Sequence, residues 1–334
     1  MMGGDSVTPQ PSQLQYTSIV HDNSQWHIFA IVSMNQKFSR DKHLPRNAIG
    51  SVLVEGLVIA ENGADIAVEA HLLNEFPPVE TIYHKSRWRL PDGIPPTIEV
   101  KLPQPKNLRL NVTAGSKLGK GRCGNVYSVS ATRLYDPSNP SDSLEPPIAP
   151  VLPELVIKVT TQQGSSLAQE AAIYQEMMKI QGVSIPRCYG WFEVDLEEGY
   201  TVRDLIERHP SDDSPSMKLS FLLLERLGDP LTMRVDYQEN EDLWDVFFDL
   251  GRMSVEHRDM RYDNILCAPK SPLSFPGKKC PYHKRVHQFR VIDFDQAVKS
   301  DYSFQGHMIN TRRLVAGVLE GVAGGYRVEP WFEW

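Results

Sequence analysis

The segment from His257 to Leu266 restricts the possible structures of this chain more than any other part of the sequence. It follows Asp242–Ser254, in which apolar residues recur at helical spacing, and it contains Asp259 and Asn264. A carboxylate can accept the proton of an attacking hydroxyl, and a nearby amide oxygen can hold a metal ion on a phosphate group. The pattern predicts an amphipathic helix that leads into a loop suited to phosphoryl transfer.

A glycine-rich segment, Leu118–Tyr127, lies upstream of this loop. Its glycines allow the backbone to come close to phosphate groups, because no side chain stands in the way. The residues that follow, Val126–Val129, alternate in the manner of a strand, whereas a dinucleotide-binding unit would begin a helix there. We therefore expect two strands and a connecting turn that cover a bound nucleotide.

Lys158 lies in the apolar segment Glu154–Val159, which predicts a strand. A buried lysine is costly unless its charge is paired, and the alternative is an edge-strand lysine that faces water. The helix predicted for Ser165–Ile180 places Glu170 on its inward face. Glu176 is rotated from Glu170 by roughly 240° about the helix axis. We expect Glu170 to pair with Lys158; the alternative is that it lies on a solvated face.

Two further apolar segments end in polar residues. Phe221–Gly228 predicts a strand followed by a polar hinge that connects two parts of the fold, although any buried strand would look similar. Phe289–Asp295 predicts a strand with Asp293 near its end. A carboxylate in that place is suited to binding the metal ion of a metal–nucleotide complex.

In this order, the segments resemble the motifs of the protein kinase superfamily, from about residue 111 to residue 298. Met260 stands where the kinase catalytic loop has leucine, and Arg261 replaces a lysine that is common there. Asp293 and Phe294 match the start of the D-F-G motif, but Asp295 replaces its glycine and reduces backbone freedom. This ending is similar to that of divergent fungal kinase-like sequences.

The resemblance implies a role for each matching residue. The residues implied in catalysis are Lys158, Glu170, Asp259, Arg261 and Asn264. Those implied in nucleotide binding are Gly119, Gly121, Gly124, Val126, Lys158, Leu224, Glu225 and Leu227. Asn264 and Asp293 would bind Mg²⁺. The implied cofactors are therefore ATP and Mg²⁺, with Val126 and Leu224 against the adenine.

The resemblance also implies a fold and a domain organisation. The fold class is α+β, a two-lobed protein-kinase-like fold with a β-rich N-terminal extension and a shortened C-terminal lobe. The expected parts are a flexible leader at 1–20, the extension at 21–110, and the kinase-like domain at 111–334, with lobes at about 111–227 and 228–334. Leu134–Pro153, rich in Pro, Ser and Asp, is predicted to be an exposed loop between two strands.

The extension contains strand signals but no recognisable chemistry. Short apolar or alternating segments at Trp26–Val32, Ser51–Val54 and Thr97–Val100 are separated by Pro, Gly and Asn. Two interpretations stay open, namely an extension that packs on the small lobe and a separate binding module.

Three classes of function fit the resemblance. The first is a Ser/Thr-type protein kinase that transfers the γ-phosphoryl group of Mg-ATP to a hydroxyl acceptor. The second is a small-molecule kinase, and the third is a pseudokinase that binds nucleotide and acts as an interaction module. The partners are accordingly ATP and a protein or small-molecule acceptor.

The sequence after Ala297 is short and contains no A-P-E motif. One helix, around Met308–Val322, is expected to cover only part of the apolar face of Leu243, Phe247 and Leu250. An uncovered face of this kind recruits a partner or aggregates, so a protein partner and poor transfer to peptides are expected. The N-terminal β-rich region could cover the face instead.

Composition limits the remaining possibilities. A net charge of −7 argues against a nucleic-acid binder, and charged residues interrupt every long apolar stretch, which argues against a membrane span. The four cysteines are scattered, and Met1–Gln10 has no apolar run. These features predict an intracellular protein, cytoplasmic or nuclear.

Cys280, His283 and His287 have a C-x-x-H-x-x-x-H spacing that could supply zinc ligands, with Cys267 upstream. They lie where a loop joins Leu266 to the strand before Asp293, after a stretch rich in Pro, Ser and Lys. The alternative is an exposed basic loop without a metal, and it is the interpretation favoured by the sequence alone.

Overall fold

The computed structural model describes residues 44–96, 107–144, 151–161, 166–204 and 217–328. The chain divides into two units, Met1–Lys42 and His43–Trp334, and every described residue belongs to the second. The leader predicted at 1–20 and the strands predicted at Trp26–Val32 and Thr97–Val100 lie outside the described residues.

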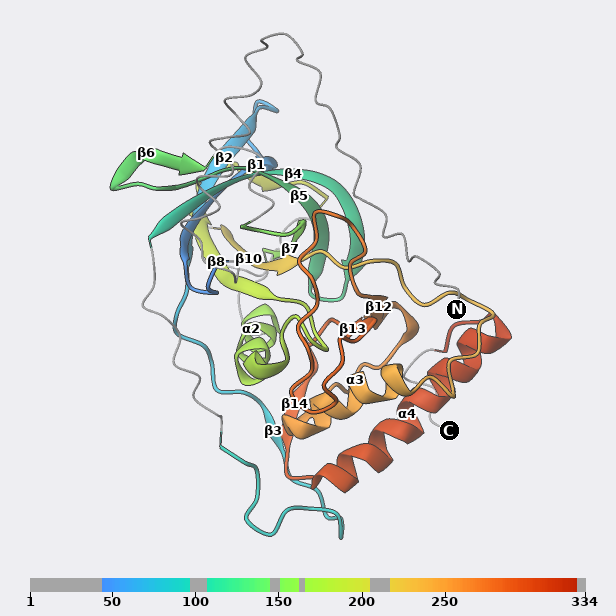
Figure 1. Cartoon of the computed structure of the whole chain (residues 1–334). Coiled ribbons are helices and arrows are strands. Elements are labelled where there is room, and N and C mark those ends of the chain that lie inside the picture. Colours follow the sequence, from blue (N-terminus) through green and yellow to red (C-terminus); the bar gives the residue numbers. More distant parts are fainter. Residues whose placement is uncertain (1–43, 97–106, 145–150, 162–165, 205–216, 329–334) are drawn as a thin grey trace, which may run out of the picture. The chain divides into compact units, whose positions relative to one another are not determined.

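Seven strands form a closed barrel (Figure 1). They are β1 (Ile49–Ile59), β2 (Asp65–Leu72), β4 (Leu108–Gly121), β5 (Gly124–Asp136), β7 (Leu155–Thr160), β8 (Cys188–Leu196) and β10 (Met217–Glu225). The order around the ring is β1-β2-β8-β10-β7-β5-β4, and β4 pairs with β1 to close it. That closing pair is parallel, whereas the other six are antiparallel. β6 (Asn139–Leu144) pairs with β5, and β9 (Thr201–Val202) pairs with β1.

Alternating side chains explain why β1 fits this ring. Val52 and Val54 are fully buried, and Leu57 and Val58 follow them into the core beyond an irregularity in the β1–β2 register. Gly56 lies at the irregularity with a φ of 72°, a conformation that glycine adopts at no steric cost. Closure leaves none of the seven strands with an unpaired edge.

Three α-helices lie outside the barrel in the described ranges. They are α2 (Ser166–Glu176), α3 (Glu241–Arg252) and α4 (Phe304–Gly324). The side chain of Asn240 caps α3 by accepting a hydrogen bond from the Leu243 amide, and Ser303 caps α4 in the same way through Gly306. Gly325 ends α4 in the left-handed conformation.

Short strands and turns connect these helices. β11 (Val255–Glu256), β14 (Val298–Ser300) and β3 (Thr81–Ile82) form one small sheet, and β12 (Ile265–Cys267) pairs with β13 (Phe289–Val291). The 3₁₀ turns are η1 (Met178–Ile180) and η2 (Tyr262–Asn264). The turn η2 and the strands β11 and β13 together frame the segment that contains Asp259.

The expected fold class is wrong. The described chain is mostly β and is built on a closed seven-stranded barrel with three α-helices, so it is not an α+β, two-lobed protein-kinase-like fold. The reason lies in β1 and β2, which the sequence analysis assigned to an extension. Hydrophobic alternation predicts that a segment is a strand, but it does not identify the strand's partners. Here β1 pairs with β4 and β2 pairs with β8, which completes the ring.

The expectation of an uncovered helix face is also wrong. Leu243, Phe247 and Leu250 of α3 are at most 3% exposed. α4 lies beside α3, as Figure 1 shows, and is longer than the helix predicted at Met308–Val322. The segment after β2 contributes further cover, because Leu73, Phe76 and Val79 pack against the same core. The apolar face of α3 therefore gives no reason to expect a partner.

The segment between β5 and β7 is more ordered than the sequence indicates. The prediction of a loop over Leu134–Pro153 is wrong for its first part, because β5 continues to Asp136 and β6 forms a hairpin with it, whereas residues 145–150 lie outside the described residues. Leu134, Val151 and Leu152 are buried. The other strands and helices predicted in the described ranges are confirmed, with bounds that differ by a few residues.

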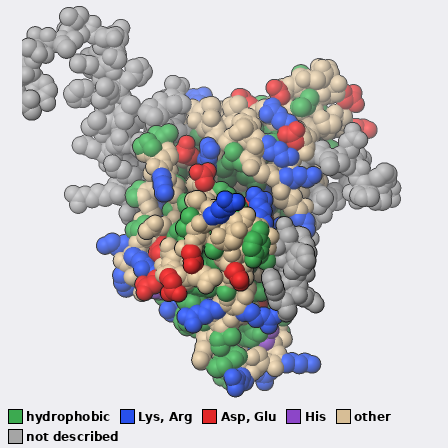
Figure 2. Space-filling view, turned by 90° about the vertical axis from the view of Figure 1, so that its right-hand side faces the viewer, with side chains coloured by type: hydrophobic (Ala, Val, Ile, Leu, Met, Phe, Trp, Pro, Cys, Tyr) green, Lys and Arg blue, Asp and Glu red, His purple; other side chains and the backbone are tan. Residues whose placement is uncertain are grey.

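The surface carries both signs of charge. On the face shown in Figure 2, Lys and Arg side chains are interspersed with Asp and Glu, and hydrophobic side chains occur between them in small groups. None of the helices in the described part of the chain has the length and apolar character needed to cross a membrane.

The packing of α4 against α3 depends on a buried neutral histidine. His307 is 2% exposed and lies against Gly251, where a Cβ would be 2.7 Å from the His307 Cβ. Burial lowers the pKa of His307 to about 4; the Glu256 carboxylate opposes this shift, and the neighbouring His84 acts with it. An unfolded chain therefore binds a proton at this position that the folded chain excludes.

We predict that the free energy of unfolding falls as the pH is lowered from about 6.5 to about 4, with up to about 3 kcal/mol from His307. In urea titrations across this pH range, His307→Gln should flatten the slope. The matched change His71→Gln, at an exposed histidine, should leave the slope as in the unaltered chain. Equal slopes for all three proteins would contradict a buried neutral imidazole.

Candidate functional site

Lys158 is the centre of the candidate site. It lies in β7, between β5 and β10, and only 5% of it is exposed. Its Nζ donates hydrogen bonds to Glu170 Oε2 at 2.6 Å and to Asp293 Oδ1 at 2.5 Å. The strand, the helix α2 and the segment after β13 thus meet at one ammonium group. The alternatives of an edge-strand lysine and a solvated Glu170 are excluded by these contacts.

The three charged groups shift one another's protonation. Burial alone would lower the pKa of Lys158, but the carboxylates of Glu170 and Asp293 outweigh it and raise that pKa. Burial raises the pKa of Glu170 even though Lys158 opposes the shift. Burial would also raise the pKa of Asp293, but Lys158 lowers it instead. One ammonium group therefore stands between two carboxyl groups, of which Asp293 is the one held more firmly in its charged form.

The segment after β11 is held in a constrained backbone conformation. Arg258 and Asp293 have φ values of 59° and 66°, in the left-handed region that residues with a side chain seldom adopt. Burial lowers the pKa of His257, so the ring is neutral, and its Nε2 lies 2.8 Å from the Ile292 carbonyl oxygen. This contact joins the segment of Asp259 to that of Asp293. Such strain is typical of functional segments.

Asp259 is fixed by its neighbours. Its carboxylate, 3% exposed, accepts hydrogen bonds from Arg261 Nε at 2.9 Å and from Arg261 Nη2 at 2.6 and 2.5 Å. The Asn264 Nδ2 donates to the Asp259 carbonyl at 2.9 Å. In this orientation Oδ1 of Asn264 is the atom that would ligate a metal.

Asp259, Asp293 and Asp295 each place a carboxylate oxygen within 4.8 Å of the others. An all-oxygen donor set suits hard cations such as Mg²⁺. The structure thus brings together six predicted residues, which are Lys158, Glu170, Asp259, Arg261, Asn264 and Asp293. It adds Asp295, which the sequence analysis treated only as a departure from a motif.

The glycine-rich turn reaches this site through Asp295. Arg122 Nη2 and Cys123 Sγ, at the tip between β4 and β5, donate to Asp295 Oδ2 at 2.9 and 2.6 Å. The strand predicted after the third glycine is confirmed as β5. Gly124 has a φ of 141°, and a Cβ there would lie 2.0 Å from the Val159 carbonyl oxygen, so only glycine fits.

The register of the sheet places the other glycine-turn residues near Lys158. Gly119 pairs with Val126, and Gly121 pairs with Gly124. Val126 in turn pairs with Lys158, which brings the turn alongside the ammonium group. Adjacent positions on neighbouring strands are within reach of one ligand.

The residues predicted to contact the base form a second, separate group. Leu224 is buried in β10 and pairs with Val156. The Glu225 side chain forms a buried ion pair with Arg187, which sequence reasoning missed, and the Glu225 amide donates to the Arg187 carbonyl. Leu227 is half-buried. The Glu225 carboxylate and amide are thus both bonded within the chain, and the Arg226 amide donates to the Glu154 carbonyl, so a role in binding the base stays a prediction.

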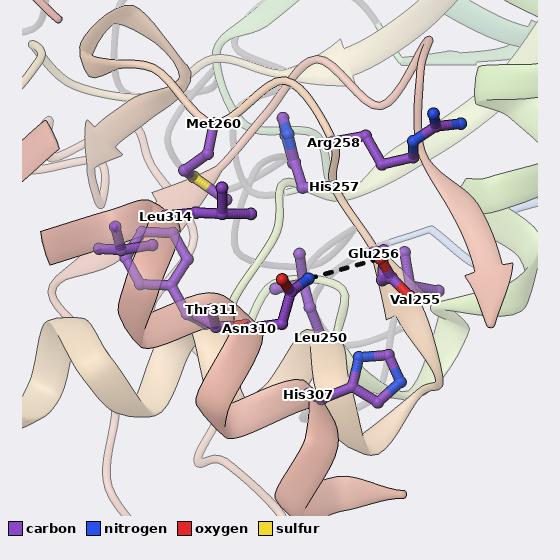
Figure 3. A pocket seen from close by; sticks show the side chains of 12 residues that line it. Leu250, Val255, Glu256, His257, Arg258, Met260, His307, Asn310, Thr311 and Leu314 are labelled. Atoms are coloured by element: carbon purple, nitrogen blue, oxygen red, sulfur yellow. Dashed lines mark hydrogen bonds between the residues drawn. The ribbon is translucent and has the colours of Figure 1, made fainter. Parts of the chain in front are cut away.

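A small pocket of about 30 Å³ borders the segment of Asp259 on the side of α3 and α4. Figure 3 shows Asn310, Thr311 and Leu314 on α4 across from His257 and Met260, with a hydrogen bond between Asn310 and Glu256. The lining residues do not include Lys158, Asp259 or Asp293. The pocket therefore lies next to the charged site and is distinct from it.

Compared with models of protein families and with curated protein sequences, the chain matches none.

We predict that Glu170→Ala destabilises the chain by about 3 kcal/mol, because it leaves the buried Lys158 with a single partner. The double variant Lys158→Met/Glu170→Ala should cost less than the sum of the two single changes by about 1 kcal/mol or more, since it removes both charges. Urea unfolding of the two single variants and the double variant measures these free energies. As a control, Glu193→Ala breaks the partly exposed pair with Lys218 and should cost under about 1 kcal/mol. Strictly additive costs at Lys158 and Glu170 would show that the two groups are not coupled.

Proposed function

We propose that the chain binds Mg-ATP beside Lys158 and Asp293 and transfers its γ-phosphoryl group to a hydroxyl acceptor. The observation that carries this proposal is the convergence of Lys158 with the Asp259, Asp293 and Asp295 carboxylates, in which Asp293 belongs to both sets. A lysine and a metal ion bound by adjacent groups are the two cations that phosphoryl transfer requires.

The protonation pattern supports a metal ion at this site. A lysine ammonium has three hydrogen-bond donors, and two are directed at Glu170 and Asp293. The third can bind a phosphate oxygen. Lys158, Arg261 and Arg122 face four carboxylates, those of Glu170, Asp259, Asp293 and Asp295. A divalent cation at Asp293 and Asn264 would offset the excess negative charge before a nucleotide adds its own.

Asp259 and Arg261 account for the transfer step. Asp259 is the group that would orient the acceptor hydroxyl and receive its proton. Arg261 donates to both oxygens of that carboxylate and can turn its planar fork to the γ-phosphate as charge develops. The turn of Gly119, Gly121 and Gly124 covers the phosphates, with its tip tied to Asp295.

The class of protein follows from the site and not from the fold. The relation to the protein kinase superfamily rests on the order of the motifs and is part of the proposal. The acceptor is a protein or a small molecule with a hydroxyl group, and the assay below includes both. All four cysteines are unpaired, which supports an intracellular, cytoplasmic or nuclear, location.

We predict that the full chain binds ATP in the presence of Mg²⁺ and that Lys158→Met or Asp293→Ala weakens binding at least tenfold, or about 1.4 kcal/mol. Isothermal titration with and without EDTA measures both effects. Asp263→Asn, at an exposed carboxylate of η2, is the matched control and should bind as the unaltered chain does. Equal affinity in all four proteins would place the nucleotide elsewhere.

Asp259→Asn should lower phosphoryl transfer by roughly 100-fold or more, a larger loss than any it causes in nucleotide binding, because the proton acceptor is lost. Labelled ATP is supplied with a protein mixture in one reaction and with small hydroxyl compounds in another. Transfer in only one reaction identifies the acceptor class. Binding without transfer to either acceptor would instead indicate a nucleotide-binding interaction module.

A further inference from the structure

A second cluster of ligand-type side chains lies away from the nucleotide site. Asp249 of α3 meets Cys280, His283 and His287, which lie between β12 and β13, and their donor atoms are all within 4.8 Å of one another. Cys280 and His287 are each 1% exposed, and Asp249 is fully buried. The interpretation of this segment as an exposed loop is therefore wrong for its cysteine and its second histidine. Asp249 occupies the place that the sequence analysis suggested for Cys267.

Four distances between donor atoms of the cluster, counting both oxygens of Asp249, are close to the edge lengths of a tetrahedral metal site. Sγ of Cys280 lies 3.4 Å from His283 Nδ1 and 3.2 Å from Asp249 Oδ2. Asp249 Oδ1 lies 3.5 Å from His283 Nδ1, and Asp249 Oδ2 lies 3.3 Å from His287 Nε2. A tetrahedral site with metal–ligand bonds of about 2.0–2.3 Å has edges of about 3.3–3.8 Å. The four side chains are therefore close enough together to share one small cation.

His287 gives independent evidence for a ligand. Its side chain is fully buried, and its Nε2 is directed into the cluster, where it faces Asp249 Oδ2 at 3.3 Å without forming a well-aligned hydrogen bond. A buried polar atom without a well-formed hydrogen bond is destabilising. Coordination through Nε2 would satisfy this atom.

The surroundings are arranged as they are around protein-bound zinc. His287 Nδ1 lies 2.7 Å from Asp242 Oδ1, and His283 Nε2 lies 3.4 Å from Asp245 Oδ1. Each imidazole thus presents one nitrogen to the cluster and the other to a carboxylate, an arrangement that orients ligating histidines. The amides of Tyr282 and His283 donate to the Cys280 sulfur at 3.3 and 3.4 Å, as expected for a thiolate.

The helix α3 supplies three of these carboxylates from one face. Asp242, Asp245 and Asp249 follow one another at helical spacing, so they point toward the same loop. Arg285 contacts Asp242 and Asp245 and fixes the outer pair in place. The loop and the helix are thus complementary before any ion binds.

We infer that Asp249, Cys280, His283 and His287 bind one zinc ion. Nitrogen and sulfur donors favour zinc over Mg²⁺ or Ca²⁺, and four protein ligands leave no open position for a substrate, so the site is structural. The ion joins α3, which leads to Asp259, to the loop that leads to Asp293. The ion stabilises the segments that lead to Asp259 and Asp293 without taking part in the chemistry. The inference of a zinc site does not depend on the proposed function.

The test uses the full chain, produced without a histidine tag and dialysed against a weak chelator. We predict one zinc ion per chain by mass spectrometry of the metal content. Cobalt-loaded protein should show the thiolate charge-transfer band and the intense visible bands of a tetrahedral site. Cys280→Ser should lose the charge-transfer band, whereas Cys267→Ser, at a half-buried thiol outside the cluster, should retain it. The inference would be overturned if the purified chain contained no zinc or if its cobalt form showed no tetrahedral spectrum. It would also be overturned if Cys280→Ser retained the thiolate charge-transfer band.

A variant outside the ligand set guards against loss of folding. Asp242→Asn keeps all four ligands but removes the carboxylate that orients His287, and it should weaken zinc affinity by roughly 10–100-fold. Competition with a chromophoric chelator measures this affinity, and circular dichroism confirms that the variant is folded. An unchanged affinity would contradict coordination through His287.

Discussion

A single buried ammonium group determines how the parts of this structure fit together. Lys158 is buried, so its charge would carry a large free-energy cost if carboxylates did not contact it. Glu170 comes from a helix and Asp293 from the segment after a strand, so satisfying one charge fixes three elements relative to one another. The barrel provides the rigid wall from which the lysine projects. The same arrangement concentrates opposite charges where a phosphate and a metal ion would be bound.

Local patterns in the sequence predicted the parts of the site that depend on one element at a time. A short apolar run identified β7 around Lys158, and helical spacing placed Glu170 on the buried side of α2. The spacing of Asp259 and Asn264 is itself a local feature, and the structure joins the Asn264 side chain to the Asp259 backbone. These predictions needed no knowledge of which strands pair.

Contacts between distant segments could not be read from the sequence. The alternation in β1 does not reveal that its neighbour is the parallel strand β4, so the closed barrel was not predicted. Asp295 was interpreted through the residue it replaces, although its role is to bind the tip of the glycine turn. Asp249 was seen only as part of an amphipathic helix. Its place in the cluster depends on Cys280, which lies 31 residues later in the chain on a loop that returns to α3.

The small sheet of β3, β11 and β14 has a consequence for how the chain folds. The His84 amide donates to the Asp301 carboxylate across 217 residues, and β3 pairs with β14 over a similar separation. Contacts of such long range close late and slow folding. During synthesis the segment around His84 leaves the ribosome long before its partner exists. The barrel strands have all been synthesised once β10 is complete, but the β3 segment between β2 and β4 must wait for β14, so the last contacts to form join an early part of the chain to a late one.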